Sequence, residues 1–198
     1  MRRFFALLLL CALFSLTGCS SKLMNTAFDP GPASYAGKST ITFFRPALIG
    51  GAIQAPLAEE LQDGRLELVG ICSARTRIRH VVEPGSHTFV VGGESGSLLK
   101  AEILPNRHYY VLVERRLGWV KARFALVALT PRDMLNPDVL SDFYKCTLVA
   151  SNAGAQAWFR KHRASMMDKL RTAKKKYAED DSRAEHTLHA EDGVNMLY

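Results

Sequence analysis

Ser97 and Lys100 have the spacing of a serine nucleophile and its lysine base, which requires both side chains to lie on one turn of a helix. The residues around them alternate in polarity as in a β-strand, and residues three apart on a strand point to opposite faces. The spacing therefore does not predict catalysis here. A hydrolase that uses Ser97 and His87 is the weakest functional alternative, and we expect no enzymatic activity.

Six histidines are spread over the chain without the spacing of a metal site. No His-Glu-x-x-His sequence occurs, and the pair His186 and His189 lies in a polar C-terminal segment. His87 follows the turn at Pro84-Gly85, where a hydrogen bond from its ring would lock the hairpin. We therefore expect neither a metal ion nor a cofactor.

The N-terminus has the layout of a signal peptide, with two arginines followed by an apolar run over residues 4–16. This run is shorter than the roughly 20 residues that span a bilayer. It ends in Leu16-Thr17-Gly18-Cys19, which resembles the lipobox of bacterial lipoproteins. The resemblance implies cleavage before Cys19 and three acyl chains on that residue, and two chains already anchor a protein stably.

The residues after the cysteine bear on location and reach. In Gram-negative lipoproteins an Asp directly after the lipidated cysteine commonly marks retention in the inner membrane, so Ser20 favours the outer membrane, with the domain facing the periplasm. Residues 19–39 contain Pro30, Gly31 and Pro32 and little periodic hydrophobicity, which predicts a flexible tether. Fully extended, such a tether would reach about 65 Å.

Cys72 and Cys146 are the thiols that remain once the signal peptide is removed and Cys19 is acylated. One expectation is a disulfide between them, because the envelope is oxidising and closing so long a loop would contribute roughly 4 kcal/mol. The other expectation is two buried free thiols. Cys72 is not part of a CxxC sequence, so redox chemistry has little support.

Residues 40–129 have the two-residue hydrophobic period of β-strands, interrupted by turn sequences such as Asp63-Gly64 and Gly92-Gly93. About seven or eight short antiparallel strands predict a sandwich or a small barrel. The expected strands are Thr40–Phe44, Gln54–Glu60, Arg65–Gly70, Thr76–Val82, His87–Val91, Leu98–Leu104, Arg107–Glu114 and Val120–Leu129.

Short motifs along these strands carry a resemblance to a known family. Phe43-Phe44-Arg45-Pro46, Gly50-Gly51-Ala52-Ile53, Asp63-Gly64, Pro84-Gly85-Ser86-His87 and His108-Tyr109-Tyr110-Val111 occur in this order. The series is similar to that of a bacterial lipoprotein family of unknown function, with modules like those of the PEGA type. The resemblance implies a β-sandwich. It implies no particular activity, because its motifs consist of turn and core residues.

After Pro131 the hydrophobic period becomes that of helices. One or two short helices are expected before Cys146, with Asn136-Pro137 as a helix start. A longer helix is expected from Ala155 to about Glu179, because this stretch lacks Pro and Gly. Residues 181–198 are polar and mixed in charge, which predicts a flexible tail.

The long helix is strongly basic outside its apolar stripe. Between Gly154 and Lys176, eight basic residues stand against one acidic residue, Asp168, in a chain whose formal charge is +7. Three interpretations stay open: a solvated helix face, contact with phosphates or carboxylates of envelope polymers or lipid headgroups, and pairing with a partner helix. No nucleic-acid partner is expected. The eight residues are Arg160, Lys161, Arg163, Lys169, Arg171, Lys174, Lys175 and Lys176.

The sequence as a whole predicts a mainly β fold, an antiparallel β-sandwich with an α-helical C-terminal extension. Its expected parts are a signal peptide (1–18), a lipidated cysteine and tether (19–39), the sandwich (40–130), the helical extension (131–180) and the tail (181–198). The expected function is a membrane-anchored, non-enzymatic module for interaction or assembly in the bacterial envelope. The alternative is a periplasmic binding module for a small ligand or an envelope polymer, such as peptidoglycan or lipopolysaccharide.

Overall fold

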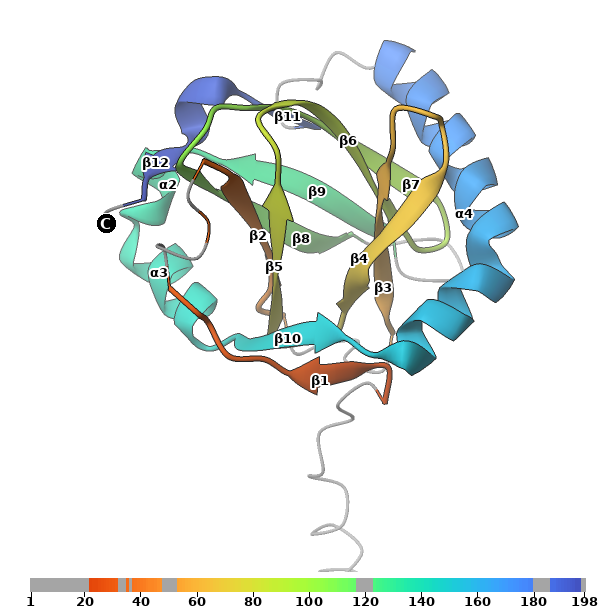
Figure 1. The fold of residues 1–198 in the computed structure, drawn as a ribbon, viewed down its shortest axis with the longest axis horizontal. Helices are drawn as coiled ribbons and strands as arrows, with labels where there is room; N and C mark the ends of the chain where they lie inside the picture. Colours follow the sequence, from red (N-terminus) through yellow and green to blue (C-terminus); the bar gives the residue numbers. More distant parts are fainter. Residues whose placement is uncertain are drawn as a thin grey trace, which may run out of the picture.

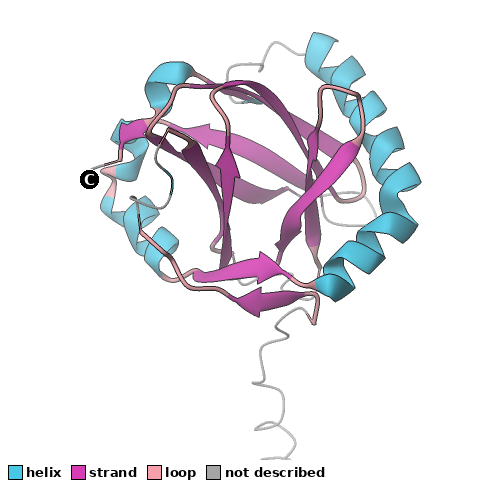
Figure 2. Cartoon of the chain, viewed as in Figure 1, coloured by secondary structure: helices cyan, strands magenta, loops and turns pink. Residues whose placement is uncertain are grey.

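The computed structural model describes residues 22–31, 35, 37–47, 53–116, 123–179 and 186–196. This part of the chain forms two β-sheets that share one hydrophobic core, with helices on the outside of the strands (Figures 1 and 2). The prediction of a mainly β fold with a C-terminal helix is confirmed. Three segments that the sequence singles out lie outside the described residues. They are the lipobox, residues 50–52 of the Gly-Gly motif and residues 120–122 of the last expected strand.

The larger sheet has seven strands in the order β1-β10-β5-β2-β8-β12, with β9 also paired to β8. The smaller sheet has the order β11-β7-β6-β3-β4. The larger sheet consists of β1 (Met24–Thr26), β2 (Ser39–Arg45), β5 (Thr76–Val82), β8 (Arg107–Arg116), β9 (Arg123–Leu129), β10 (Thr147–Ser151) and β12 (Val194–Asn195). The smaller consists of β3 (Ala55–Glu60), β4 (Leu66–Cys72), β6 (Gly85–Gly92), β7 (Gly96–Ile103) and β11 (Thr187–Leu188).

Both sheets are mixed, so the prediction of a purely antiparallel sandwich is wrong. Strand β2 pairs in parallel with β8, β5 with β10, and β7 with β11. Parallel neighbours need a long connection, and here the connection from β2 to β8 passes through β3–β7, including most of the smaller sheet.

All eight expected strands overlap β2 to β9, but four further strands depart from the expected organisation. Strand β10 follows the short helices. Strand β1 lies in the expected tether and pairs with β10, whereas β11 and β12 lie in the expected tail and pair with β7 and β8. Leu188 of β11 is fully buried, so packing holds this segment in place. The predictions of a fully flexible tether and tail are therefore wrong for the described parts of 19–39 and 181–198.

Arg45, at the end of β2, is a fully buried charge. Its Nη1 donates to the carbonyl oxygens of Ile53 (2.6 Å) and Cys72 (3.3 Å), and its guanidinium lies 4.8 Å from the ring centroid of Phe124. Arg45 thus ties the larger sheet to segments at the ends of β3 and β4, which gives the Phe-Phe-Arg-Pro motif a structural role.

Among the described residues, three α-helices lie outside the sheets, and a short 3-10 helix, η4 (Ala190–Asp192), lies between β11 and β12. Helices α2 (Pro131–Met134) and α3 (Pro137–Tyr144) follow β9, and Asn136 caps α3 by accepting the N–H of Asp138 (2.9 Å), as the sequence predicts. Helix α4 (Ala153–Glu179) packs on the smaller sheet through Phe159, Met166 and Leu170. No helix in the described ranges is both long and apolar enough to cross a membrane.

Candidate functional site

Two of the eight basic residues attach α4 to the smaller sheet. Lys169 Nζ donates to the carbonyl oxygens of Gly93 (2.8 Å) and Glu94 (3.4 Å). Lys174 Nζ forms an ion pair with Glu60 of β3 (2.6 Å). The ammonium groups of these two lysines are bound by partners within the chain. Two residues of the expected polyanion contact therefore have a structural role.

The other six basic residues are exposed on α4. Arg171 forms an ion pair with Asp168 (2.9 Å), and the remaining five have no ion pair with any carboxylate of the described residues. Successive helix residues are rotated by about 100°, so Arg160, Lys161, Arg171 and Lys175 project to one side, away from the sheet. We call these four residues the basic face. It is about 22 Å long at 1.5 Å per residue.

Asn152 fixes the N-terminal segment to the start of α4. Its Oδ1 accepts the N–H of Ala155 (3.1 Å), which caps the helix, and its Nδ2 donates to the carbonyl oxygen of Lys22 (3.0 Å) and to Oδ1 of Asn25 (3.1 Å). Beside this clamp, β1 pairs with β10 in antiparallel register (Figure 1). The chain is therefore held against the domain already at residues 22–26, far earlier than a tether ending at residue 39 would allow.

A cavity of about 250 Å³ opens beside β5 and β8. Arg79 and Tyr110 line it from these strands, and Val194 and Met196 line it from the C-terminal segment. Arg79 is mostly buried; its Nη1 is paired with Asp29, whereas its Nε is buried without a hydrogen-bond partner among the described residues. A guanidinium in this setting can bind a small carboxylate or phosphate.

His108 forms one wall of this cavity and is held by two buried threonines. Its Nδ1 and Nε2 lie 3.0 and 2.9 Å from the hydroxyls of Thr40 and Thr42. Burial, with the nearby charge of Arg79, lowers the pKa of His108 to about 4, so the ring is neutral at neutral pH. The sequence did not single out Arg79 or His108 as site residues. The only local signal was the polar alternation around Arg79 on its strand.

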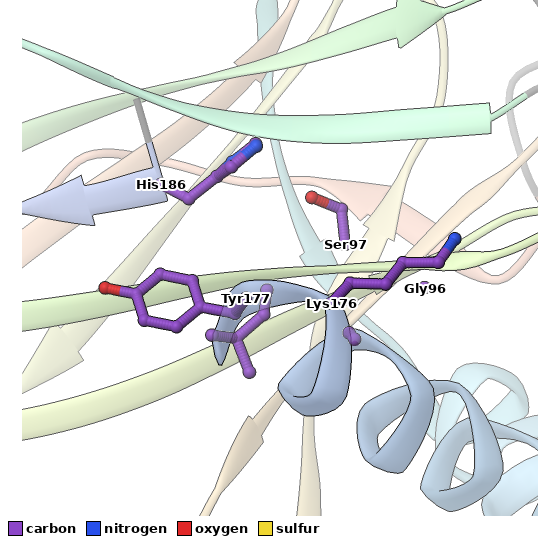
Figure 3. Close-up of a pocket in the computed structure, with 7 residues that line it drawn as sticks. Gly96, Ser97, Lys176, Tyr177 and His186 are labelled. Carbon is purple, nitrogen blue, oxygen red and sulfur yellow. The ribbon is translucent and has the colours of Figure 1, made fainter. Parts of the chain in front are cut away.

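Figure 3 shows a smaller cavity, of about 90 Å³, which Ser97 lines together with Lys176, Tyr177 and His186. His186 Nδ1 donates to the carbonyl oxygen of Leu126 (3.0 Å), and within the described chain no hydrogen bond joins His186 to Ser97. This arrangement therefore lacks a nucleophile and base in contact.

The partners that the sequence offered for Ser97 lie elsewhere. Lys100 is exposed on the α4 side of β7, with its ammonium 5.0 Å from the ring centroid of Tyr177. His87 is opposite Ala101 in the β6–β7 register, four residues along from Ser97, which corresponds to about 13 Å. The structure brings neither residue to Ser97.

Cys72 and Cys146 are buried free thiols, so the second of the two expectations holds and the disulfide is absent. Cys146 Sγ donates to the carbonyl oxygen of Asp142 (3.3 Å), and Cys72 Sγ lies 3.7 Å from that of Thr76. Burial raises the pKa of Cys72 to about 12 and that of Cys146 to about 11, so neither forms a reactive thiolate.

Glu59 of β3 connects the two sheets through His80 of β5, and it also contacts His87 of β6 in its own sheet. Its carboxylate lies 2.7 Å from Nε2 of His80 and 2.6 Å from Nδ1 of His87. The Nε2 of His87 lies 2.8 Å from the carbonyl oxygen of Glu83, which locks the hairpin as the sequence predicts. Because both ring nitrogens of His87 face acceptors, this geometry requires a doubly protonated ring, and the hydrogen bond to Glu59 raises the pKa of His87.

The described residues contain no group of three or more His, Cys, Asp or Glu side chains placed to hold a metal ion. The class of protein that the structure defines is a mainly β domain of two mixed sheets with a covering basic helix. The chain matches no protein-family model, no curated protein and no solved structure. The resemblance of its motifs to a lipoprotein family stays a prediction.

Proposed function

We propose that this chain is a bacterial lipoprotein, anchored through acylated Cys19 in the outer membrane, whose periplasmic domain contacts an anionic component of the envelope without catalysing a reaction. The observation that carries the proposal is the basic face of α4. Its four cations project into solvent, whereas Lys169 and Lys174 contact the smaller sheet and the loop after β6. The separation of Ser97 from Lys100 and His87 is further support for a non-enzymatic role.

The anchor is tested by replacing Cys19 with alanine and fractionating the cells. We expect the wild-type protein to remain with the membranes after a high-salt wash and to be released by detergent, since acyl chains are not displaced by salt. The Cys19→Ala variant should lose its detergent-dependent retention. Cys11→Ala is the matched control, because this residue lies within the apolar run and its replacement should leave anchoring unchanged. Retention of Cys19→Ala after the high-salt wash would contradict the proposal.

Binding of a small anionic ligand in the cavity beside Arg79 is a second candidate function, favoured by the buried Nε of that residue, which has no hydrogen-bond partner among the described residues. Acetate and inorganic phosphate serve as probes, with the ring resonances of His108 followed by NMR. We expect saturable shifts with at least one probe and at least tenfold weaker binding in Arg79→Met. Arg77→Met is the control, because Arg77 packs on Phe143 (4.5 Å to the ring centroid). Shifts that do not saturate would rule this candidate out.

A further inference from the structure

We propose that the basic face of α4 docks on the anionic phospholipid headgroups of the membrane that holds Cys19, so that α4 lies along the bilayer surface. This inference rests on the proposed function and names the anionic partner. Its first support is the reach of the anchor. Asn152 holds the carbonyl of Lys22, and Cys19 precedes Lys22 by three residues, which span at most about 11 Å of extended chain.

The same clamp sets the position of the helix relative to the anchor. Because Asn152 also caps α4, the start of the helix and Lys22, three residues after Cys19, are fixed together. At 1.5 Å per residue, Arg160 lies about 12 Å and Lys175 about 35 Å along the axis from Asn152. The near end of the basic face is therefore within reach of the headgroups whenever Cys19 is inserted, and a tilt of the domain brings in the far end.

Electrostatics favours the orientation in which the whole face touches the membrane. With four basic residues and the interspersed Asp168, the exposed stripe has a formal charge of +3. Charges interact strongly with a membrane surface only within a Debye length, which is about 8 Å at physiological ionic strength. A free polymer must be captured from solution, whereas the anchor presents the bilayer to the face at high effective concentration. These points favour the bilayer over a soluble polyanion.

The test uses the mature chain, residues 19–198, with Cys19→Ser so that no acyl chain contributes. Its sedimentation is measured with vesicles of phosphatidylcholine alone and of phosphatidylcholine with phosphatidylglycerol. We expect binding to the phosphatidylglycerol vesicles only, and we expect it to weaken as salt is added. Arg160→Glu/Lys175→Glu should reduce the bound fraction at low occupancy at least tenfold.

The matched control is Arg65→Glu/Arg132→Glu, which makes the same change of charge at two exposed positions that are not part of α4. This control should change binding less than twofold, and thermal unfolding shows that both variants fold. Equal losses in the two variants, or no binding to phosphatidylglycerol, would overturn the inference. Binding to purified peptidoglycan but not to vesicles would also overturn it and assign the face to a polymer. Because the protein is not acylated, these outcomes are independent of the Cys19 experiment.

Discussion

Replacing Phe159 with alanine is expected to lower the free energy of unfolding by about 3 to 5 kcal/mol. Phe159 is 1% exposed and packs with residues of the smaller sheet, among them Leu66, Val90 and Leu98. Removing the ring leaves a void between a 27-residue helix and the sheet, and both are too rigid to close it. Urea denaturation followed by circular dichroism measures the change.

Arg160 is the natural control for this experiment, because it is the next residue in the helix and is exposed. Arg160→Ala should change the free energy of unfolding by less than about 0.5 kcal/mol. A loss below 1 kcal/mol for Phe159→Ala would mean that α4 is an appendage and not part of the core. If Phe159→Ala lowers the free energy of unfolding by the expected 3 to 5 kcal/mol, α4 is part of the core. Truncation before α4 would then unfold the domain, so only surface substitutions can test the function of the helix.

Replacing Glu59 with glutamine is expected to cost about 3 kcal/mol of stability between about pH 4.5 and 6.5. The Glu59 side chain is 13% exposed. Burial alone would raise its pKa, but the hydrogen bonds from His80 and His87, together with their charges, lower it from 4.5 to about 2. Glutamine keeps the shape and can still form hydrogen bonds, so the loss is mainly that of the charge.

The signs of the two pKa shifts define this pH window. The pKa of Glu59 is lowered, so its contribution is complete above about 4.5 and is lost as the pH falls toward 2. The pKa of His87 is raised from 6.5, so its contribution is complete below 6.5 and is lost as the pH rises through the folded value. Chemical denaturation between about pH 2 and 6.5 should show the wild-type and Glu59→Gln stabilities converging toward pH 2.

Glu60 provides a matched control one residue away. It forms an ion pair with the half-exposed Lys174, and pairs of this kind contribute about 1 kcal/mol or less. Glu60→Gln should therefore cost little at any pH in the range. Stability curves of Glu59→Gln and the wild type that stay parallel across the whole range would show that the cluster is not a charged bridge.

The strands that could be predicted from the sequence are those whose own residues show the two-residue hydrophobic period. β2 to β9 have alternating polarity and turn sequences between them, and β5 was predicted to the residue at Thr76–Val82. β1, β11 and β12 are only two or three residues long, too short for any period to appear. They exist because neighbouring strands offer free edges, and this is a property of the assembled sheets. The parallel pairing of β2 with β8 likewise follows from the path of the chain.

The candidate sites divide in the same way. The helical period places Arg160 and Lys175 on one side of α4, so a basic face could be predicted from spacing alone. The spacing could not show that Lys169 instead donates a hydrogen bond to the carbonyl oxygen of Gly93, because that contact depends on how α4 packs on the sheet. The cavity beside Arg79 was not predictable, since Asp29, Arg79 and His108 come from three separate segments.

The pairing of β1 and β12 with strands distant in sequence determines when the larger sheet can form. β1 pairs with β10, which comes more than a hundred residues later, and β12 adds to β8 with the last described residues of the chain. Contacts this distant in sequence form slowly, because long loops must close first. The larger sheet therefore stays incomplete until Asn195 has been synthesised. This delay would suit the export that we propose, in which the chain is threaded unfolded through a translocation channel before it folds on the other side.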